Sequence, residues 1–150
     1  METSDQSTLV ILSGYFGPIH VGHLDMIEAG AAAGDELYVI VNNNLQQQLK
    51  KGRVIIDEAD RLRIVEALRV VDHAMIAVDG DATVCASIEA IAKQFPEHAI
   101  VFGNGGDRHP DGDAVPETDV CDRYGITMVY GMGGTAKADS STRLIEELDL

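Results

Sequence analysis

Basic residues are scarce in this 150-residue sequence. It has 11 Lys and Arg against 25 Asp and Glu, which gives a formal net charge of −14 at pH 7. A field of that sign repels nucleic acid and anionic membrane surfaces, so it argues against partners of either kind. An anionic ligand must then be held locally, by backbone N–H groups, helix N-termini and a few basic side chains. The acidic bias fits a salt-adapted source and an ordinary acidic protein about equally well.

Cysteine and long apolar runs are also scarce. The two cysteines, Cys85 and Cys121, stand apart from any Cys/His cluster, so a structural zinc site has no support. We interpret both as small packing residues in a reducing compartment. No apolar stretch approaches the roughly 20 residues that a membrane helix needs, and residues 1–7 lack the regions of a signal peptide. We therefore expect a cytoplasmic protein.

Short apolar runs alternate with helical patterns along the chain. Repeated βα units build parallel sheets with right-handed crossovers. The pattern predicts one α/β domain over residues 1–150, a Rossmann-like three-layer α/β/α sandwich with a five-stranded parallel sheet. Asp81 is predicted to cap the third of its helices. The predicted strands are 9–12, 37–41, 74–78, 99–102 and 126–130, and the predicted helices are 21–33, 58–69, 82–94, 117–124 and 140–148.

Every unusual loop of the sequence follows a predicted strand. The carboxyl ends of parallel strands lie at one edge of a sheet, and ligands of such folds bind outside that edge. We therefore expect the four loops to meet on one rim and to form a single site. They span residues 14–20, 42–57, 103–116 and 131–139.

The first of these loops leads from Gly14 into the sequence His20-Val21-Gly22-His23. His20 and His23 are three residues apart at a helix start, so both project from one face. Gly22 permits close approach to the backbone, and the helix N-terminus offers N–H groups and the positive end of its dipole. This arrangement suits phosphoryl transfer, with the imidazoles donating hydrogen bonds to phosphate oxygens. For an isolated H-x-x-H, two surface histidines or a zinc-binding pair are the alternatives.

The segment resembles the signature of the cytidylyltransferase-like nucleotidyltransferases, G-x-F-D-x-x-H-x-G-H. The resemblance implies an enzyme that moves a nucleoside monophosphate from a nucleoside triphosphate onto a phosphorylated small molecule and releases pyrophosphate. Gly17 departs from the signature, because the family usually carries Asp or Asn there to position the phosphates or the metal. Either a backbone N–H substitutes, or the activity is reduced. The agreeing positions are Gly14, Phe16, His20, Gly22 and His23.

The second loop, 42–57, is a basic and polar connection in an acidic protein. It carries Lys50 and Lys51, and Arg61 follows on the next predicted helix. The loop is either simply solvated or a mobile lid that clamps phosphate charge. The resemblance implies that a lysine of this loop contacts the α-phosphate, without deciding between Lys50 and Lys51. It also implies a role for Arg61, which matches an arginine that the family carries ahead of an apolar stripe.

Two later segments complete the expected site. The stretch from Asn104 to Arg108 is glycine-rich, so it is either an ordinary turn or a place where the backbone approaches a base or ribose. The stretch from Ser140 to Arg143 opens the last predicted helix, either as a cap or as a phosphate cradle. The resemblance favours the functional alternative for both, because related enzymes carry G-G-D or G-D-D and a run of hydroxyl residues at these places.

Together these segments predict a nucleotidyltransferase with nucleotide-bound Mg²⁺ and no metal ligands of its own. The preferred reaction uses CTP and a phosphorylated alcohol or polyol. An adenylyltransferase acting on a sugar 1-phosphate is the alternative, and a catalytically weak regulatory domain is an alternative of another class. The resemblance also implies a homodimer, because this is the usual oligomeric state of the family. The predicted catalytic residues are His20, His23, Lys50 and Lys51, and the predicted nucleotide- or phosphate-binding residues are Gly14, Tyr15, Phe16, Gly17, Gly22, Arg61, Asn104, Gly106, Asp107, Arg108, Ser140, Ser141, Thr142 and Arg143.

Overall fold

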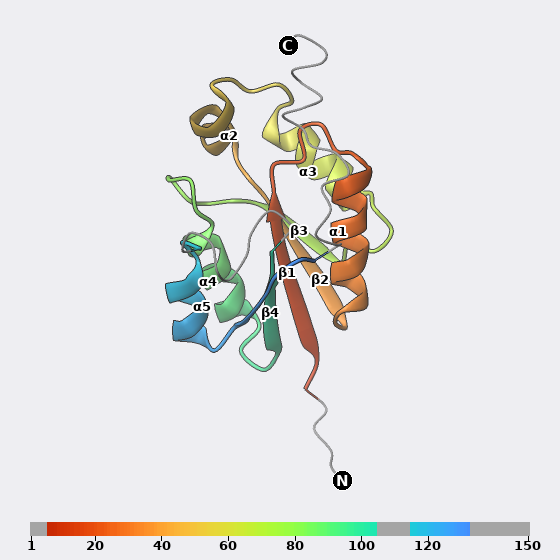
Figure 1. Cartoon of the computed structure of the whole chain (residues 1–150), viewed down its shortest axis with the longest axis vertical. Helices are drawn as coiled ribbons and strands as arrows, with labels where there is room; N and C mark the ends of the chain where they lie inside the picture. The colour runs from red at the N-terminus through yellow and green to blue at the C-terminus, as the bar shows by residue number, and fades with distance from the viewer. Residues whose placement is uncertain (1–5, 105–114, 133–150) are drawn as a thin grey trace.

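The computed structural model describes residues 6–104 and 115–132. Five parallel strands form one sheet in the order β3-β2-β1-β4-β5 (Figure 1), which confirms the predicted sheet. The strands are β1 (Thr8–Gly14), β2 (Glu36–Val41), β3 (His73–Ile76), β4 (Ala99–Gly103) and β5 (Thr127–Val129). The helices are α1 (Val21–Ala32), α2 (Asn44–Lys51), α3 (Glu58–Glu66), α4 (Cys85–Gln94) and α5 (Thr118–Tyr124).

The central strand, β1, is buried on both faces, which explains its continuous apolar run. Leu9 and Ile11 belong to a core cluster that includes side chains of α4 and α5. Val10 and Leu12 belong to a second cluster, which includes side chains of α1 and α3. Helices therefore cover both faces of the sheet, as Figure 1 shows, and the predicted three-layer arrangement is confirmed.

Helix α2 occupies a segment that was predicted to be a loop, so that prediction was wrong for residues 44–51. Asn43 caps the helix: its side chain accepts from the Gln46 N–H at 2.9 Å, and Gln46 Oε1 accepts from the Asn43 N–H at 2.9 Å. This reciprocal pair is a capping box with amides in both places. The apolar side chains of the helix, Leu45 and Leu49, lie four residues apart and are exposed, so they do not pack on the core as the apolar face of most helices does.

Helix α4 begins three residues later than predicted, and Asp81 is not its cap: the N-cap residue is Val84, whose side chain makes no capping hydrogen bond. The Asp79 carboxylate accepts from the N–H groups of Ala86 at 2.7 Å and Ser87 at 3.2 Å. Asp81 instead accepts from the Thr83 N–H at 2.9 Å and forms a turn before the helix. Asp79 is only 6% exposed, and a buried carboxylate must find donors, which the first turn of α4 supplies.

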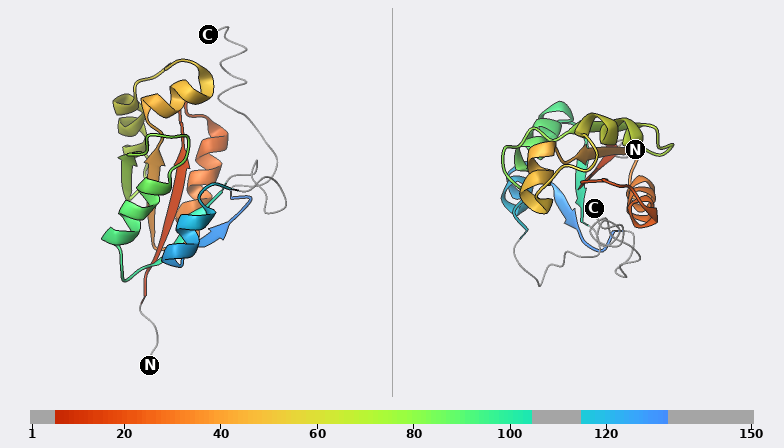
Figure 2. Two further views of the ribbon diagram at one scale, coloured as in Figure 1. Left: turned by 90° about the vertical axis from the view of Figure 1, so that its left-hand side faces the viewer. Right: turned by 90° about the horizontal axis from the view of Figure 1, so that it is seen from above.

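The carboxyl ends of the strands lie at one end of the molecule, and α2 lies across that end (Figure 2). The exits of β1 and β2 are joined there by a hydrogen bond from the Asn42 N–H to the Gly14 carbonyl, at 2.8 Å. The predicted helix over 140–148 lies outside the described residues. Within the described ranges, no helix has both the length and the apolar character needed to cross a membrane.

Candidate active site

Helix α1 starts with a capping box made of two histidines. His20 is the N-cap, and its Nδ1 accepts from the Gly22 N–H at 3.1 Å, while His23 Nδ1 accepts from the His20 N–H at 3.2 Å. The two rings stack with their centroids 3.9 Å apart. Because each Nδ1 is an acceptor, each neutral ring must carry its proton on Nε2. Both imidazoles are therefore Nε2–H donors at the N-terminus of a helix.

The electrostatic setting keeps His23 uncharged. Burial, the adjacent His20 and the positive charge of Lys51 together lower the pKa of His23 from 6.5 to about 4. A neutral imidazole donates a hydrogen bond to a phosphate oxygen and retains its proton in doing so. At neutral pH the proton of His23 is thus on Nε2, because Nδ1 accepts from the His20 N–H at the start of the helix.

Phe16 packs against the ring of His23. Its backbone has a φ of 52°, and the ring folds back over Gly14, where an added Cβ would lie 2.7 Å from the ring. The Phe16 side chain is 1% exposed, and its ring meets the His23 ring edge-on with centroids 5.0 Å apart. In this structure Gly14 and Phe16 therefore support His23. A direct nucleotide contact by either residue remains a prediction.

Arg61 fastens three segments of the rim together. Its guanidinium donates from Nε to the Ile56 carbonyl at 2.8 Å, and from Nη1 to the carbonyls of Tyr15 at 2.9 Å and Asn42 at 2.5 Å. Nη2 donates to Asn44 Oδ1 at 3.0 Å. The side chain is 1% exposed, and these acceptors compensate for the burial of its charge. In this structure Arg61 positions loops, and a phosphate contact by Arg61 remains a prediction.

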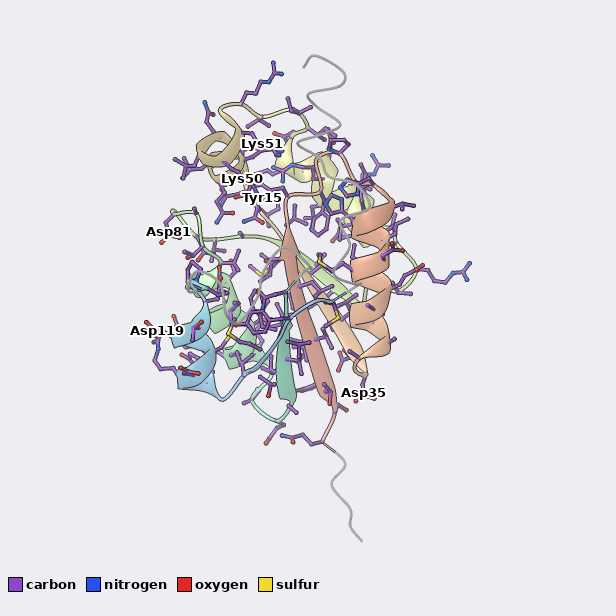
Figure 3. The ribbon with its side chains drawn as sticks, viewed as in Figure 1. Tyr15, Asp35, Lys50, Lys51, Asp81 and Asp119 are labelled. Atoms are coloured by element: carbon purple, nitrogen blue, oxygen red, sulfur yellow. The ribbon has the colours of Figure 1, made fainter. Side chains whose placement is uncertain are left out.

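The two lysines at the end of α2 have different surroundings. Lys50 Nζ lies 4.7 Å from the centroid of the Tyr15 ring, a cation–π contact. Lys51 is the lysine whose charge helps to lower the pKa of His23. Figure 3 shows both lysines and Tyr15 together beside the end of β1, at the opposite end of the sheet from Asp35. The structure therefore brings Lys51 into electrostatic contact with His23.

Asn104 joins the ends of β4 and β5. Its backbone N–H and its Nδ2 both donate to the Val129 carbonyl, at 2.7 and 3.2 Å, and its own carbonyl accepts from the Met132 N–H at 2.8 Å. The side chain is 3% exposed, so in this structure it serves as a connection between strands. The other predicted residues of the late loops lie outside the described residues: Gly106, Asp107, Arg108, Ser140, Ser141, Thr142 and Arg143.

A histidine pair at the start of the first helix, beside a lysine from the second β–α connection, is the arrangement that the sequence signature predicts. A family model described as Cytidylyltransferase-like matches residues 11–124. The chain belongs to this family.

Relatives of known name agree with the family assignment. An FAD synthase of Natrialba magadii is 39% identical over 146 residues, covering 97% of this chain and 89% of the relative. The bifunctional protein HldE of Geobacter metallireducens is 32% identical over 146 residues, covering 93% of this chain and 28% of that longer protein. The crystal structure of the lipopolysaccharide core biosynthesis protein from Thermoplasma volcanium GSS1 shares the fold, with a TM-score of 0.63 at 24% identity, covering 89% and 99% of the two chains. The protein is an enzyme of the nucleotidyltransferase class, as predicted.

One departure from the cytidylyltransferase-like signature has a steric counterpart. Gly17 is buried, and an added Cβ would lie 2.9 Å from Arg61 Cδ and 2.9 Å from Gln47 Nε2. The space that an Asp side chain would need is therefore filled from α2 and α3. Sequence reasoning missed Gln47, because a glutamine within a polar stretch gives no signal of its own. Its spacing of three and four residues from Lys50 and Lys51 is the one sign that it shares their helix face.

Proposed function

We propose that this nucleotidyltransferase transfers AMP from ATP to FMN and releases pyrophosphate. The observation that carries the reaction type is the pair of Nε2–H donors at the start of α1, beside the charge of Lys51. ATP and FMN are supported by the relative named FAD synthase, because FAD consists of AMP and FMN joined through a pyrophosphate bond. This choice replaces the CTP and phosphorylated polyol favoured by the sequence alone.

The proposed reaction needs no covalent intermediate. A phosphate oxygen of FMN attacks the α-phosphorus of ATP, and the bond from that phosphorus to the departing pyrophosphate oxygen breaks. His20 and His23 donate from Nε2 to phosphate oxygens, whose negative charge grows as the bond breaks. Lys51 neutralises part of this charge, and the rigid helix start holds the donors in place before the substrate arrives.

Magnesium fits this site as a partner of the nucleotide. Within the described residues, no group of three or more His, Cys, Asp and Glu side chains is placed to hold a metal ion. The donors of this part of the chain thus suit Mg²⁺ that is coordinated mainly by phosphate oxygens and water. When bound, the ion would neutralise charge on the triphosphate, while His20, His23 and Lys51 act on the phosphates directly.

A matrix of substrates tests the proposal. The purified chain is incubated with MgCl₂ and either ATP or CTP, together with FMN, glycerol 3-phosphate or a sugar 1-phosphate. Pyrophosphate is measured, and the product mass is determined. We expect pyrophosphate and FAD from ATP with FMN. Product formed with CTP but not with ATP would overturn the choice of nucleotide. If no pair gave product, the remaining alternative would be a catalytically weak regulatory domain. A His20→Ala/His23→Ala variant, purified in parallel, controls for contaminating activity.

A second candidate is adenylylation of a sugar 1-phosphate, which the similarity to HldE favours. Product from ATP with the sugar phosphate and none with FMN would select it. We also expect a homodimer, because this is the usual oligomeric state of the family. Sedimentation velocity measures the oligomeric state directly. A monomer at micromolar concentration would contradict that expectation.

A further inference from the structure

Two neighbouring glutamines of α2 are both fully buried, yet only one has its hydrogen bonds satisfied. Gln46 Oε1 accepts from Asn42 Nδ2 at 2.9 Å, and its Nε2 donates to the carbonyls of Asp81 at 2.8 Å and Thr83 at 2.7 Å. Gln47 is also 0% exposed, and neither Nε2 nor Oε1 has a hydrogen-bond partner in the described structure. A buried group without a partner destabilises a fold by about 1–3 kcal/mol. Because its buried amide destabilises the fold, Gln47 is a candidate for a role in ligand binding.

The Gln47 amide lies against the loop that carries the histidine pair. Its Nε2 is 2.9 Å from the point where a Cβ on Gly17 would lie, and Gly17 is three residues before His20. Residues three and four apart share a helix face, so Gln47 lies on the side of α2 that also carries Lys50 and Lys51. Lys50 contacts Tyr15 in the same loop. This face of α2 is thus turned toward the site.

We propose that Gln47 is a binding residue for the nucleotide phosphates, and that its amide occupies the space where the signature usually has the carboxylate side chain of residue 17. The inference rests on the proposed function, because it adds a residue to the same nucleotide site. The Nε2 group donates to a phosphate oxygen once the triphosphate is bound, which satisfies the amide that is unsatisfied in the free chain. Glycine at 17 leaves the space that the amide needs.

A substitution that removes only the polar amide tests this proposal. Gln47→Met keeps the length of the side chain without its hydrogen-bonding groups. We expect its melting temperature to rise by about 2 °C or more, because a buried unsatisfied amide is lost. We expect its Kd for ATP with MgCl₂ to rise about tenfold or more, because a hydrogen bond to a charged phosphate is lost. Thermal unfolding and isothermal titration measure the two effects.

The neighbouring glutamines are matched controls. Gln46→Met should lower the melting temperature, because the carbonyls of Asp81 and Thr83 lose their donor. Gln48→Met, on the exposed side, should change neither quantity. A Gln47→Met variant that is less stable than the wild type, or that binds ATP equally well, overturns the inference and leaves the proposed function standing. A wild-type chain that binds neither ATP nor CTP overturns both.

A pair of variants tests the exchange between positions 17 and 47. Gly17→Asp alone should lower the melting temperature, because the new side chain collides with Gln47 and Arg61. Gly17→Asp combined with Gln47→Ala should recover the part of that stability lost through the collision with Gln47, so the two effects should not be additive. Additive effects would show that the two positions do not share one space, and would overturn the exchange.

Discussion

The structure places a pair of histidines at each end of the sheet, and their neighbours differ in charge. At the carboxyl ends of the strands, His20 and His23 stack on each other, and the positive Lys51 helps to lower the pKa of His23. At the amino ends, the Nε2 atoms of His73 and His98 lie 2.9 and 2.8 Å from the two carboxylate oxygens of Glu36. These two hydrogen bonds lower the pKa of Glu36.

The difference between the two pairs shows how surroundings set the role of one residue type. The Nδ1 atoms of His20 and His23 accept from backbone N–H groups, and burial is the main cause of the lowered pKa that keeps His23 neutral. His73 and His98 face a carboxylate and pack on the ring of Phe95, with centroids 5.5 and 5.0 Å away. The first arrangement favours ligand binding, and the second links the starts of β2 and β3 with the residue before β4.

The largest effect is expected from the pair beside Lys51. His23→Ala should lower kcat for product formation by about 10²–10⁴-fold, because a donor to the developing charge is lost. His20→Asn should show a comparable loss, although Asn keeps the helix cap. The matched variant at the other end, His73→Ala, should retain activity within about twofold. Pyrophosphate release at saturating substrate measures all three, and a loss shared equally by His73→Ala would contradict the division of roles.

The next effect separates the two lysines. Lys51→Ala should reduce kcat/KM by about tenfold to a hundredfold, because it removes the charge that acts at His23 and at the phosphates. Lys50→Ala should cost less, since Lys51 is the lysine whose charge acts at His23. Lys51→Ala should also raise the pKa of His23, which NMR titration of the imidazole measures. An unchanged His23 pKa would refute the coupling.

The pH dependence of folding follows from the lowered pKa of His23. Its value is about 4 in the folded chain against 6.5 in the unfolded chain, so the unfolded chain binds more protons between these pH values. The contribution of His23 to the free energy of unfolding is therefore complete above pH 6.5 and is lost as the pH falls toward 4. The loss amounts to roughly 3 kcal/mol at most. Urea unfolding at pH 7 and pH 5 measures the loss. His23→Gln should remove most of it, and His73→Gln should not.

The smallest effect is expected from Glu36. Its lowered pKa contributes stability that is present above the unfolded pKa and is lost as the pH falls through the folded pKa. The carboxylate is one-third exposed, so solvent weakens the pair. Glu36→Gln should leave kcat unchanged and shift the midpoint of urea unfolding only slightly. A loss of activity in this variant would show that the two ends of the sheet are coupled.

The five-stranded parallel sheet and the place of the histidine pair at a helix start could be predicted from the sequence, but the order of the strands was not predicted. The central strand gave an unbroken apolar run, and H-x-G-H at a helix start indicated donors near an anion site. Helix α2 was missed although Asn43 and Gln46 form a capping box that signals a helix start, because its few apolar side chains face solvent and do not pack on the core. That Asp79, and not Asp81, accepts from the first-turn N–H groups of α4 depends on burial, which nearby sequence does not reveal.

Other features of the site depend on contacts between distant segments. The distinction between Lys50 and Lys51 follows from which of them lies near His23, 28 positions earlier than Lys51 in the sequence. The burial of Arg61 depends on carbonyl groups that only the folded loops bring together. The fit between Gly17 and Gln47 likewise depends on the placement of α2 over the β1 exit. Local patterns predict residue types at a site, and the tertiary fold decides which of them meet.

Arg61 makes the rim behave as one cooperative unit. The carbonyls that it holds, on Tyr15, Asn42 and Ile56, belong to three segments that are separated in the sequence. If one segment opens, donors of the same guanidinium lose their acceptor, so the remaining segments become easier to open as well. Amide hydrogens along these segments should therefore exchange with similar opening free energies. Lysine cannot replace Arg61, because one compact ammonium lacks the planar set of donors that serves all three carbonyls.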